Sequence, residues 1–313
     1  MIRGHTENGS LSESGAATPS TGFGEIYLRL PVAICLLAGC MLLQVPIHLV
    51  MKPLLGKNLA VAAAMLMGML LPAAAAVLWI SPRPGETLRL RTISLHGIIA
   101  VAGTSLSFAL AAGGLLEWLL RAGRIPPTLV ALLEQEEMFF REIFRLQSGF
   151  DLIIVGVVLI GIAPLTEELL FRGLFQGSLE RAIGHWPAIL IAALSFGLLH
   201  GRVRFIPVTL LGLLMGYMVM RTNSLPTGMV AHGINNLTVL FLSQLFAWYS
   251  SSLHLPLFAA IGGGIGLIIF LGRFRSLTRN HPRIPKRGPQ NDPSSLRQDI
   301  PEGRKRISDV FFP

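Results

Sequence analysis

Long apolar runs recur along this chain, and they constrain its fold more than any other feature. A helix needs about 20 predominantly apolar residues to cross a bilayer. Only 14% of the residues are charged, against about 25% in a soluble domain. We therefore predict an all-α, polytopic membrane protein with about eight transmembrane helices, the fifth and sixth short enough to be tilted or re-entrant. The candidate spans are residues 30–51, 59–80, 93–116, 151–171, 187–201, 205–221, 225–247 and 255–271.

The two ends of the chain are polar or basic, and they flank the segments predicted to hold membrane helices. Residues 1–28 are rich in Ser, Gly, Thr and Glu and lack apolar periodicity, which predicts a disordered polar arm. Residues 29–149 are predicted to hold the N-terminal transmembrane helices and an interfacial helix, and residues 248–272 the last transmembrane helix. Residues 273–313 carry ten Lys and Arg against four Asp and Glu. This composition, which is also rich in Pro and Ser, predicts a basic, disordered tail.

The stretch "IPPTLVALLEQEEMFFREIFRLQSG", residues 125–149, predicts the interfacial helix. Apolar side chains recur at roughly helical spacing with Glu and Arg between them, a pattern typical of a helix lying at the membrane surface. Such a helix could gate a neighbouring active site or only pack at the interface, and we favour interfacial packing. Its apolar residues are Leu129, Leu132, Leu133, Phe139, Phe140, Ile143 and Phe144.

The basic residues indicate a topology. Eight spans place both termini on one side, and Arg83, Arg89 and Arg91 share that side with the basic tail. Since Lys and Arg are enriched in cytoplasmic loops, we predict that both termini are cytoplasmic, although other loops also carry basic residues. The tail is suited to contact anionic membrane lipids. It lacks aromatic interleaving and a recognisable nucleic-acid-binding fold, so no nucleic-acid partner is expected.

Three charges interrupt the fourth span, in "PLTEELLFRG", residues 164–173. Charged groups at bilayer depth are costly and usually functional. Glu168 and Arg172 are four residues apart with the acid first, the favoured order for a helical ion pair. Adjacent helical residues point about 100° apart, so Glu167 and Glu168 should not face one point. The spacing predicts a structural Glu168–Arg172 pair and a chemical role for Glu167, although all three charges could serve only to tie helices together.

Further polar side chains occur at helical spacing in later spans. In "FGLLH", Phe196 precedes His200 by one turn, so its ring can hold the imidazole in place. In "HGINN", His232 and Asn236 lie on one helix face and can point at a single oxygen, as an oxyanion site requires. The alternatives are an interfacial histidine and an interhelical polar clamp.

Taken together, these groups supply a base, two histidines and an amide donor within a helical bundle. Such a set suits activation of water and stabilisation of a tetrahedral intermediate. The sequence contains neither the HExxH pattern of zincins nor the GxSxG pattern of serine hydrolases, which excludes their standard forms.

The order EExxxR, FxxxH and HxxxN resembles the CPBP family of CAAX proteases and bacteriocin-processing enzymes, also called the Abi family. The resemblance covers about residues 150–247, which it implies are a catalytic core. It implies an intramembrane endopeptidase with an all-helical core, acting on a membrane-associated or lipidated peptide or protein. A bacterial inner membrane is the compartment that the spread of the family favours.

The resemblance also assigns roles. It implies that Glu167 and His200 activate the attacking water and that His232 and Asn236 stabilise the oxyanion. Glu168 and Arg172 would support the first glutamate.

Two questions stay open at this point. The family is often labelled as metalloproteases, and Glu167, His200 and His232 could ligate a divalent metal such as Zn²⁺. They could equally work without a metal, which we favour, and no cofactor is certain. The other functions considered are a non-catalytic membrane immunity or scaffold protein of the same fold and an ion-coupled transporter, the latter disfavoured because no internal repeat is visible.

Overall fold

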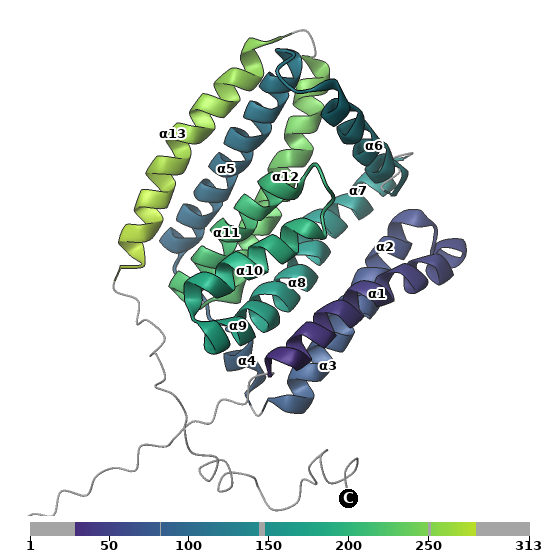
Figure 1. Cartoon of the computed structure of the whole chain (residues 1–313), viewed down its shortest axis with the longest axis vertical. Coiled ribbons are helices and arrows are strands. Elements are labelled where there is room, and N and C mark those ends of the chain that lie inside the picture. Colours follow the sequence, from purple (N-terminus) through teal and green to yellow (C-terminus); the bar gives the residue numbers. More distant parts are fainter. Residues whose placement is uncertain (1–28, 82, 144–147, 250–251, 280–313) are drawn as a thin grey trace, which may run out of the picture. The chain divides into compact units, whose positions relative to one another are not determined.

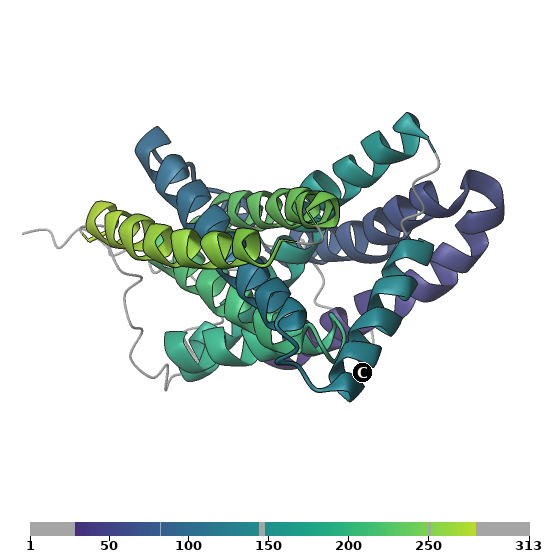
Figure 2. The ribbon, with the colours of Figure 1, turned by 90° about the horizontal axis from the view of Figure 1, so that it is seen from above.

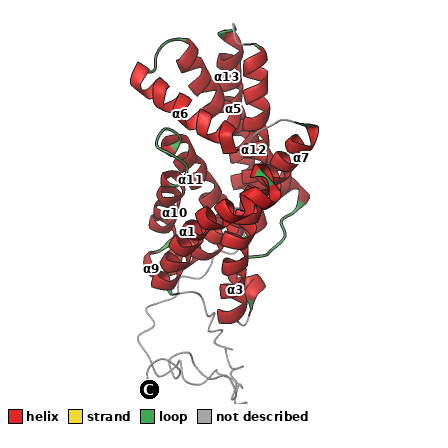
Figure 3. Cartoon of the chain, turned by 90° about the vertical axis from the view of Figure 1, so that its right-hand side faces the viewer, coloured by secondary structure: helices red, strands yellow, loops and turns green. Residues whose placement is uncertain are grey.

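All regular structure in the described part of this computed structural model, residues 29–81, 83–143, 148–249 and 252–279, is helical (Figures 1 and 3). These residues belong to one compact unit, residues 25–287. Within them, seven helical stretches are long and apolar enough to cross a membrane, judged by length and composition. They are Leu30–Leu55, Lys57–Ile80, Leu95–Arg121, Gly149–Ile183, Phe205–Thr222, Leu225–Trp248 and His254–Leu277.

Five of these stretches are single α-helices, and two are interrupted by π-helical turns. The single helices are α1 (Leu30–Leu55), α5 (Leu95–Arg121), α11 (Phe205–Thr222), α12 (Leu225–Trp248) and α13 (His254–Leu277). The second stretch comprises α2 (Lys57–Met65), η1 (Leu66–Leu70) and α3 (Leu71–Ile80). The fourth comprises α7 (Gly149–Val157), η2 (Val158–Ile162), α8 (Ala163–Glu168), η3 (Leu169–Phe175) and α9 (Gln176–Ile183). The shorter helices are α4 (Pro84–Thr87), α6 (Pro127–Ile143) and α10 (His185–Leu198).

The fold confirms the polytopic all-α prediction, with one difference in the fifth predicted span. That span, residues 187–201, is the 14-residue helix α10. At 1.5 Å per residue, α10 is about 21 Å long, which is shorter than the ~30 Å hydrocarbon core. The chain therefore has seven full-length candidate spans and one short apolar helix in its described part, and His200 follows α10 in a loop.

The ends of the chain need a second correction. Helix α13 continues to Leu277, so residues 273–277 are helical and the predicted disordered tail cannot begin at residue 273. Residues 1–28 and 280–313, which contain the predicted arm and most of the predicted tail, lie outside the described residues. The predicted interfacial helix is α6; Phe144 lies outside the described residues.

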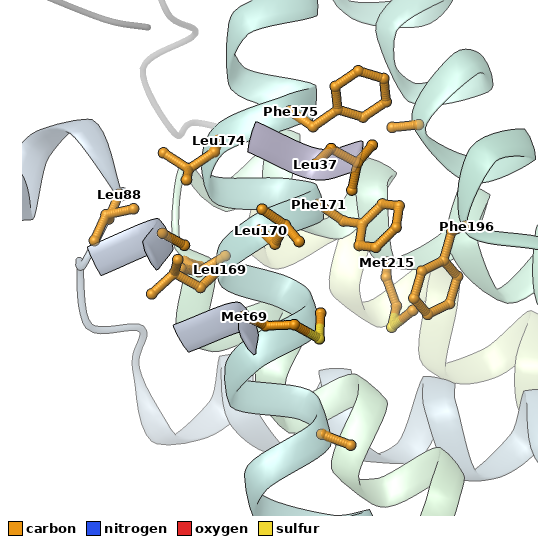
Figure 4. Close-up of a cluster of buried hydrophobic side chains, with 14 of the residues drawn as sticks. Leu37, Met69, Leu88, Leu169, Leu170, Phe171, Leu174, Phe175, Phe196 and Met215 are labelled. Carbon is orange, nitrogen blue, oxygen red and sulfur yellow. The ribbon is translucent and has the colours of Figure 1, made fainter. Parts of the chain in front are cut away.

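The fourth helical stretch lies at the centre of the packing. All seven residues of η3 are buried, and their apolar side chains meet residues of α1, η1, α10 and α11 (Figure 4). The outward faces of the helices are apolar too: Trp248 is 83% exposed and Ile268 is 77% exposed. Because lipid is as apolar as these side chains, the helices associate mainly through close packing.

Small residues allow that close packing between α5 and α13, which lie side by side (Figures 1 and 2). A Cβ atom added at Gly263 would lie 2.4 Å from the backbone nitrogen of Ala111, and one at Gly266 would lie 2.5 Å from Ser107 Oγ. A side chain at either glycine would therefore push the two helices apart.

Prolines explain two of the three π-helical turns. Pro164 follows η2 by two residues, and Pro72 follows η1 by two residues. A proline inside a helix lacks an N–H donor, and its ring clashes with the carbonyl four residues earlier. Those carbonyls belong to Ile160 and Gly68, which lie in η2 and η1. Widening the turn to the π register relieves the clash and leaves carbonyl groups without a helical partner.

Candidate active site

The polar residues singled out in the sequence come from α8, η3, the loop after α10, and α12. Glu167 is on α8, His200 is in the loop after α10, and His232 is on α12. Glu167 Oε2 lies 3.6 Å from His200 Nε2 and 3.9 Å from His232 Nε2. The structure thus brings together three side chains that are widely separated in the sequence.

The two glutamates approach one histidine ring from opposite sides. Glu168 Oε1 lies 3.1 Å from His232 Nδ1, whereas Glu167 Oε2 is nearest to Nε2 of the same ring. The expectation that adjacent glutamates cannot face one point needs this correction, because an imidazole offers two nitrogens about 2 Å apart to side chains that diverge along the helix. Glu168 therefore contacts His232, beyond its predicted pairing with Arg172.

Hydrogen bonds place a proton on Nδ1 of both histidines. His200 Nδ1 lies 2.7 Å from the carbonyl oxygen of Phe196, which can only accept, so Nδ1 donates. By the same argument, His232 Nδ1 donates to the carboxylate of Glu168. In each neutral ring, the Nε2 lone pair then faces Glu167 Oε2, a buried oxygen that has no hydrogen-bond partner. A water molecule could bridge these acceptors, since it has two hydrogens to donate.

The predicted Glu168–Arg172 pair forms in the interior. Arg172 Nη1 donates to Glu168 Oε1 over 2.7 Å, and the two side chains are 1% and 0% exposed. The guanidinium carbon of Arg172 also lies 4.3 Å from the centre of the Phe196 ring, a cation–π contact. Burial makes the two charges depend on each other, because either one alone would be left uncompensated.

Phe196 connects this ion pair with both histidines. Its ring centre is 4.3 Å from that of His200 and 5.8 Å from that of His232, the latter in an edge-to-face arrangement. The structure shows the predicted contact between Phe196 and His200 and adds the contacts with His232 and Arg172. Phe196 is buried, so its ring can hold both imidazoles in place.

Asn236 is anchored by the proline-induced π turn. Its amide nitrogen donates to the carbonyl oxygen of Leu159 over 2.8 Å. In the π register, this carbonyl would bond the backbone nitrogen of residue 164, which is Pro164 and has no hydrogen. Asn236 therefore supplies the missing donor and keeps its second amide hydrogen for another acceptor.

Sequence reasoning missed the role of Gly228, one turn before His232 on α12. A Cβ atom at this position would lie 2.6 Å from Glu168 Oε2. The absence of a side chain lets α12 approach the buried carboxylate, which places His232 within reach of it. A helical glycine in an apolar span is too common to have indicated this contact.

The site is buried but reachable from one side. The side chains of His232, Glu167 and His200 are 5%, 15% and 29% exposed, respectively, so of these three side chains His200 is the most open to the surroundings. Among the described residues, no group of three or more His, Cys, Asp and Glu side chains is arranged to hold a metal ion. A metal held by Glu167, His200 and His232 stays a prediction.

The sequence of this region matches a known family. Residues 149–238 match the family model described as Type II CAAX prenyl endopeptidase Rce1-like. The resemblance to the CPBP family is confirmed for this segment. All seven site residues predicted from the sequence lie inside this CPBP segment, whereas α1 to α6 and α13 lie outside it. Neither the curated proteins nor the solved structures gave a match.

The two findings together establish what kind of protein this is. The seven apolar helices make the chain an integral membrane protein, and its residues 149–238 are similar to Rce1-like CAAX prenyl endopeptidases.

Proposed function

We propose that this protein is an intramembrane endopeptidase that hydrolyses a peptide bond with a water molecule activated by Glu167 and His200. The observation that carries the proposal is the buried Glu167 Oε2, without a hydrogen-bond partner and faced by two histidine nitrogens at 3.6 and 3.9 Å. A carboxylate and an imidazole converging in this way can accept the protons of one water. The CPBP segment supports peptidase chemistry over other uses of the same residues.

In the proposed reaction, the water bound between Glu167 Oε2 and His200 Nε2 attacks the carbonyl carbon of the substrate. Glu167 accepts a proton from the water as the new C–O bond forms, and the carbonyl oxygen becomes an oxyanion. When the C–N bond breaks, Glu167 returns the proton to the leaving nitrogen. The products are a carboxylic acid and an amine, and the enzyme regains its starting protonation state.

His232 and Asn236 are proposed to stabilise the oxyanion. Asn236 has one amide hydrogen left after bonding Leu159. Because Nδ1 of His232 donates to Glu168, Nε2 can donate to an oxyanion only when the ring is doubly protonated. Glu168 and Arg172 are therefore proposed to orient and balance the charge of His232, as well as to support Glu167.

An apolar groove beside the site suits a membrane-associated or lipidated substrate. A cavity of about 330 Å³ opens between α12 and the η2–α8 segment. Its wall includes Pro164 and Leu165, within one turn of Glu167, and Gly233, next to His232. A lipid chain or a transmembrane segment could rest there with its scissile bond near Glu167. The proposed setting is a bacterial inner membrane with both termini cytoplasmic.

Cleavage of a lipidated or transmembrane peptide by the purified protein in detergent or liposomes tests this proposal. We expect wild type to release the product and Glu167→Gln and His200→Ala to lose activity by at least about a hundredfold. Cys35→Ala, a change on α1 outside the CPBP segment, is the matched control and should behave as wild type. Equal cleavage by Glu167→Gln and wild type would refute the catalytic role of Glu167. If cells that carry Glu167→Gln had the same phenotype as wild-type cells, the non-catalytic alternative would be favoured.

A further inference from the structure

Helix α6 meets the CPBP segment through a carboxylate. Every side chain of α6 that the structure describes, Pro127–Met138, is at least partly exposed. Glu136 reaches across: its Oε1 accepts a hydrogen bond from the backbone N–H of Val203 over 3.0 Å, and its Oε2 is buried. Because the described side chains of α6 bury so little surface, this polar contact matters for the position of the helix.

The contact is on the loop that follows His200, between α10 and α11 (Figure 3). Gly201 adopts a φ of +101°, and a Cβ atom there would lie 2.8 Å from Glu136 Oε1. The position thus needs glycine both for its backbone conformation and for the space that the carboxylate occupies. Arg204, at the end of the same loop, attracts Glu136 electrostatically. Glu136 is therefore fitted to this loop by shape, by hydrogen bonding and by charge.

His200 is restrained along the chain from both sides. The backbone N–H of His200 donates to the Gly197 carbonyl, and the ring is held by Phe196. Both of these contacts are to α10, on the N-terminal side of His200. On the C-terminal side, the Glu136–Val203 hydrogen bond holds the chain three residues later. The His200 side chain is 29% exposed, more than those of Glu167 and His232, so packing restrains it less than either of them.

We infer that Glu136 is a positioning residue: by holding the loop of residues 201–204, it keeps His200 Nε2 directed at Glu167, and it couples α6 to the reaction. The effect on catalysis rests on the proposed function. The inference gives a role to α6, a helix that lies outside the matched segment of residues 149–238. A displacement of about 1 Å can lower a catalysed rate by up to a hundredfold, so loss of this contact should affect turnover more than substrate binding.

The test compares Glu136→Ala, Glu136→Gln and Glu134→Ala in the full-length protein, with peptide cleavage as the assay. We expect Glu136→Ala to lower kcat by about ten- to a hundredfold with KM within about twofold of wild type. Glu136→Gln should recover most of the loss, because the amide oxygen can still accept from the Val203 N–H. Glu134→Ala, an exposed glutamate on the same helix, is the control and should match wild type.

A second measurement does not depend on activity. Diethyl pyrocarbonate modifies accessible, unprotonated imidazole nitrogens, and mass spectrometry can locate the modified residues. We expect Glu136→Ala to raise the modification rate of His200 severalfold and to leave that of the exposed His254 unchanged.

Wild-type kcat together with a wild-type His200 modification rate in Glu136→Ala would overturn the inference. A Glu136→Gln variant as impaired as the alanine variant would overturn the role of the Val203 hydrogen bond. If wild type cleaves no peptide, the proposed function fails, whereas a specific rise in His200 modification would still support the positioning role.

Discussion

Replacing Arg172 with methionine should leave the carboxylate of Glu168 buried without its cation. The two side chains are 1% and 0% exposed, and their contact is 2.7 Å long. Removing one partner of such a pair costs about 3–5 kcal/mol, since the remaining charge is buried without its counter-ion. Methionine keeps most of the volume, so a cavity adds little. At about 1.4 kcal/mol per tenfold change, the folding equilibrium should fall by more than about a hundredfold.

The assay is reversible unfolding in mixed detergent micelles, followed by circular dichroism. The free energy of unfolding is extrapolated to micelles without the denaturing detergent. The matched control is Arg83→Met. Arg83 pairs with Glu86 over 3.6 Å, but these side chains are 50% and 51% exposed. An exposed pair contributes about 0–1 kcal/mol, so the control should lose no more than that.

A double variant separates a lost interaction from a stranded charge. Combining Arg172→Met with Glu168→Gln removes both charges, and glutamine can still accept from His232 Nδ1. The double variant should therefore be more stable than the sum of the two single losses predicts, by at least about 1–2 kcal/mol. A loss below about 1 kcal/mol for Arg172→Met, or strict additivity, would refute the reasoning that Glu168 is a buried anion held by Arg172.

Three further predictions follow from other parts of the site. Gly228→Ala places a methyl group 2.6 Å from Glu168 Oε2 and should cost about 1–3 kcal/mol of unfolding free energy in the same micelle assay; Gly262→Ala, which meets no atom within 4 Å, is its control, and equal stability of the two variants would contradict the close approach. Asn236→Ala should lower kcat by about a hundredfold or more with little change in KM if its amide stabilises the oxyanion, and a change confined to KM would argue against that role. Prolonged dialysis of the enzyme against a chelator should leave peptide cleavage unchanged, and activity that is lost and then restored by Zn²⁺ would instead favour the metal-dependent alternative.

Local spacing predicted the contacts that lie within one helix turn. The Glu168–Arg172 pair and the Phe196–His200 ring contact each join residues four apart, and both are present. Such pairs depend on helical geometry alone, which is why they could be predicted without knowing how the helices pack. The glycines of α13 could not be placed in the same way: Gly266 meets Ser107, whereas Gly262 faces open space and its neighbour Gly263 contacts α5. Which face of an apolar helix turns inward cannot be judged when both faces are apolar.

Contacts between different helices and loops could be seen only in the tertiary structure. The approach of His232 to both glutamates depends on how α12 crosses α8, which in turn depends on the missing side chain at Gly228. The contact of Glu136 with the Val203 backbone joins residues 67 positions apart, and one of its two groups is a main-chain N–H that carries no sequence signal.

The sequence alone determined the membrane setting, the helical class and the set of reactive side chains, because hydrophobic length and the rarity of intramembrane charge are properties of composition and spacing. Only the tertiary structure decided which of those side chains converge, which nitrogen of each histidine faces Glu167, and which element outside the CPBP segment holds His200. Those facts depend on the angles and separations at which apolar helices pack, and the atoms that set them are small residues, prolines and backbone groups that look alike in any membrane span.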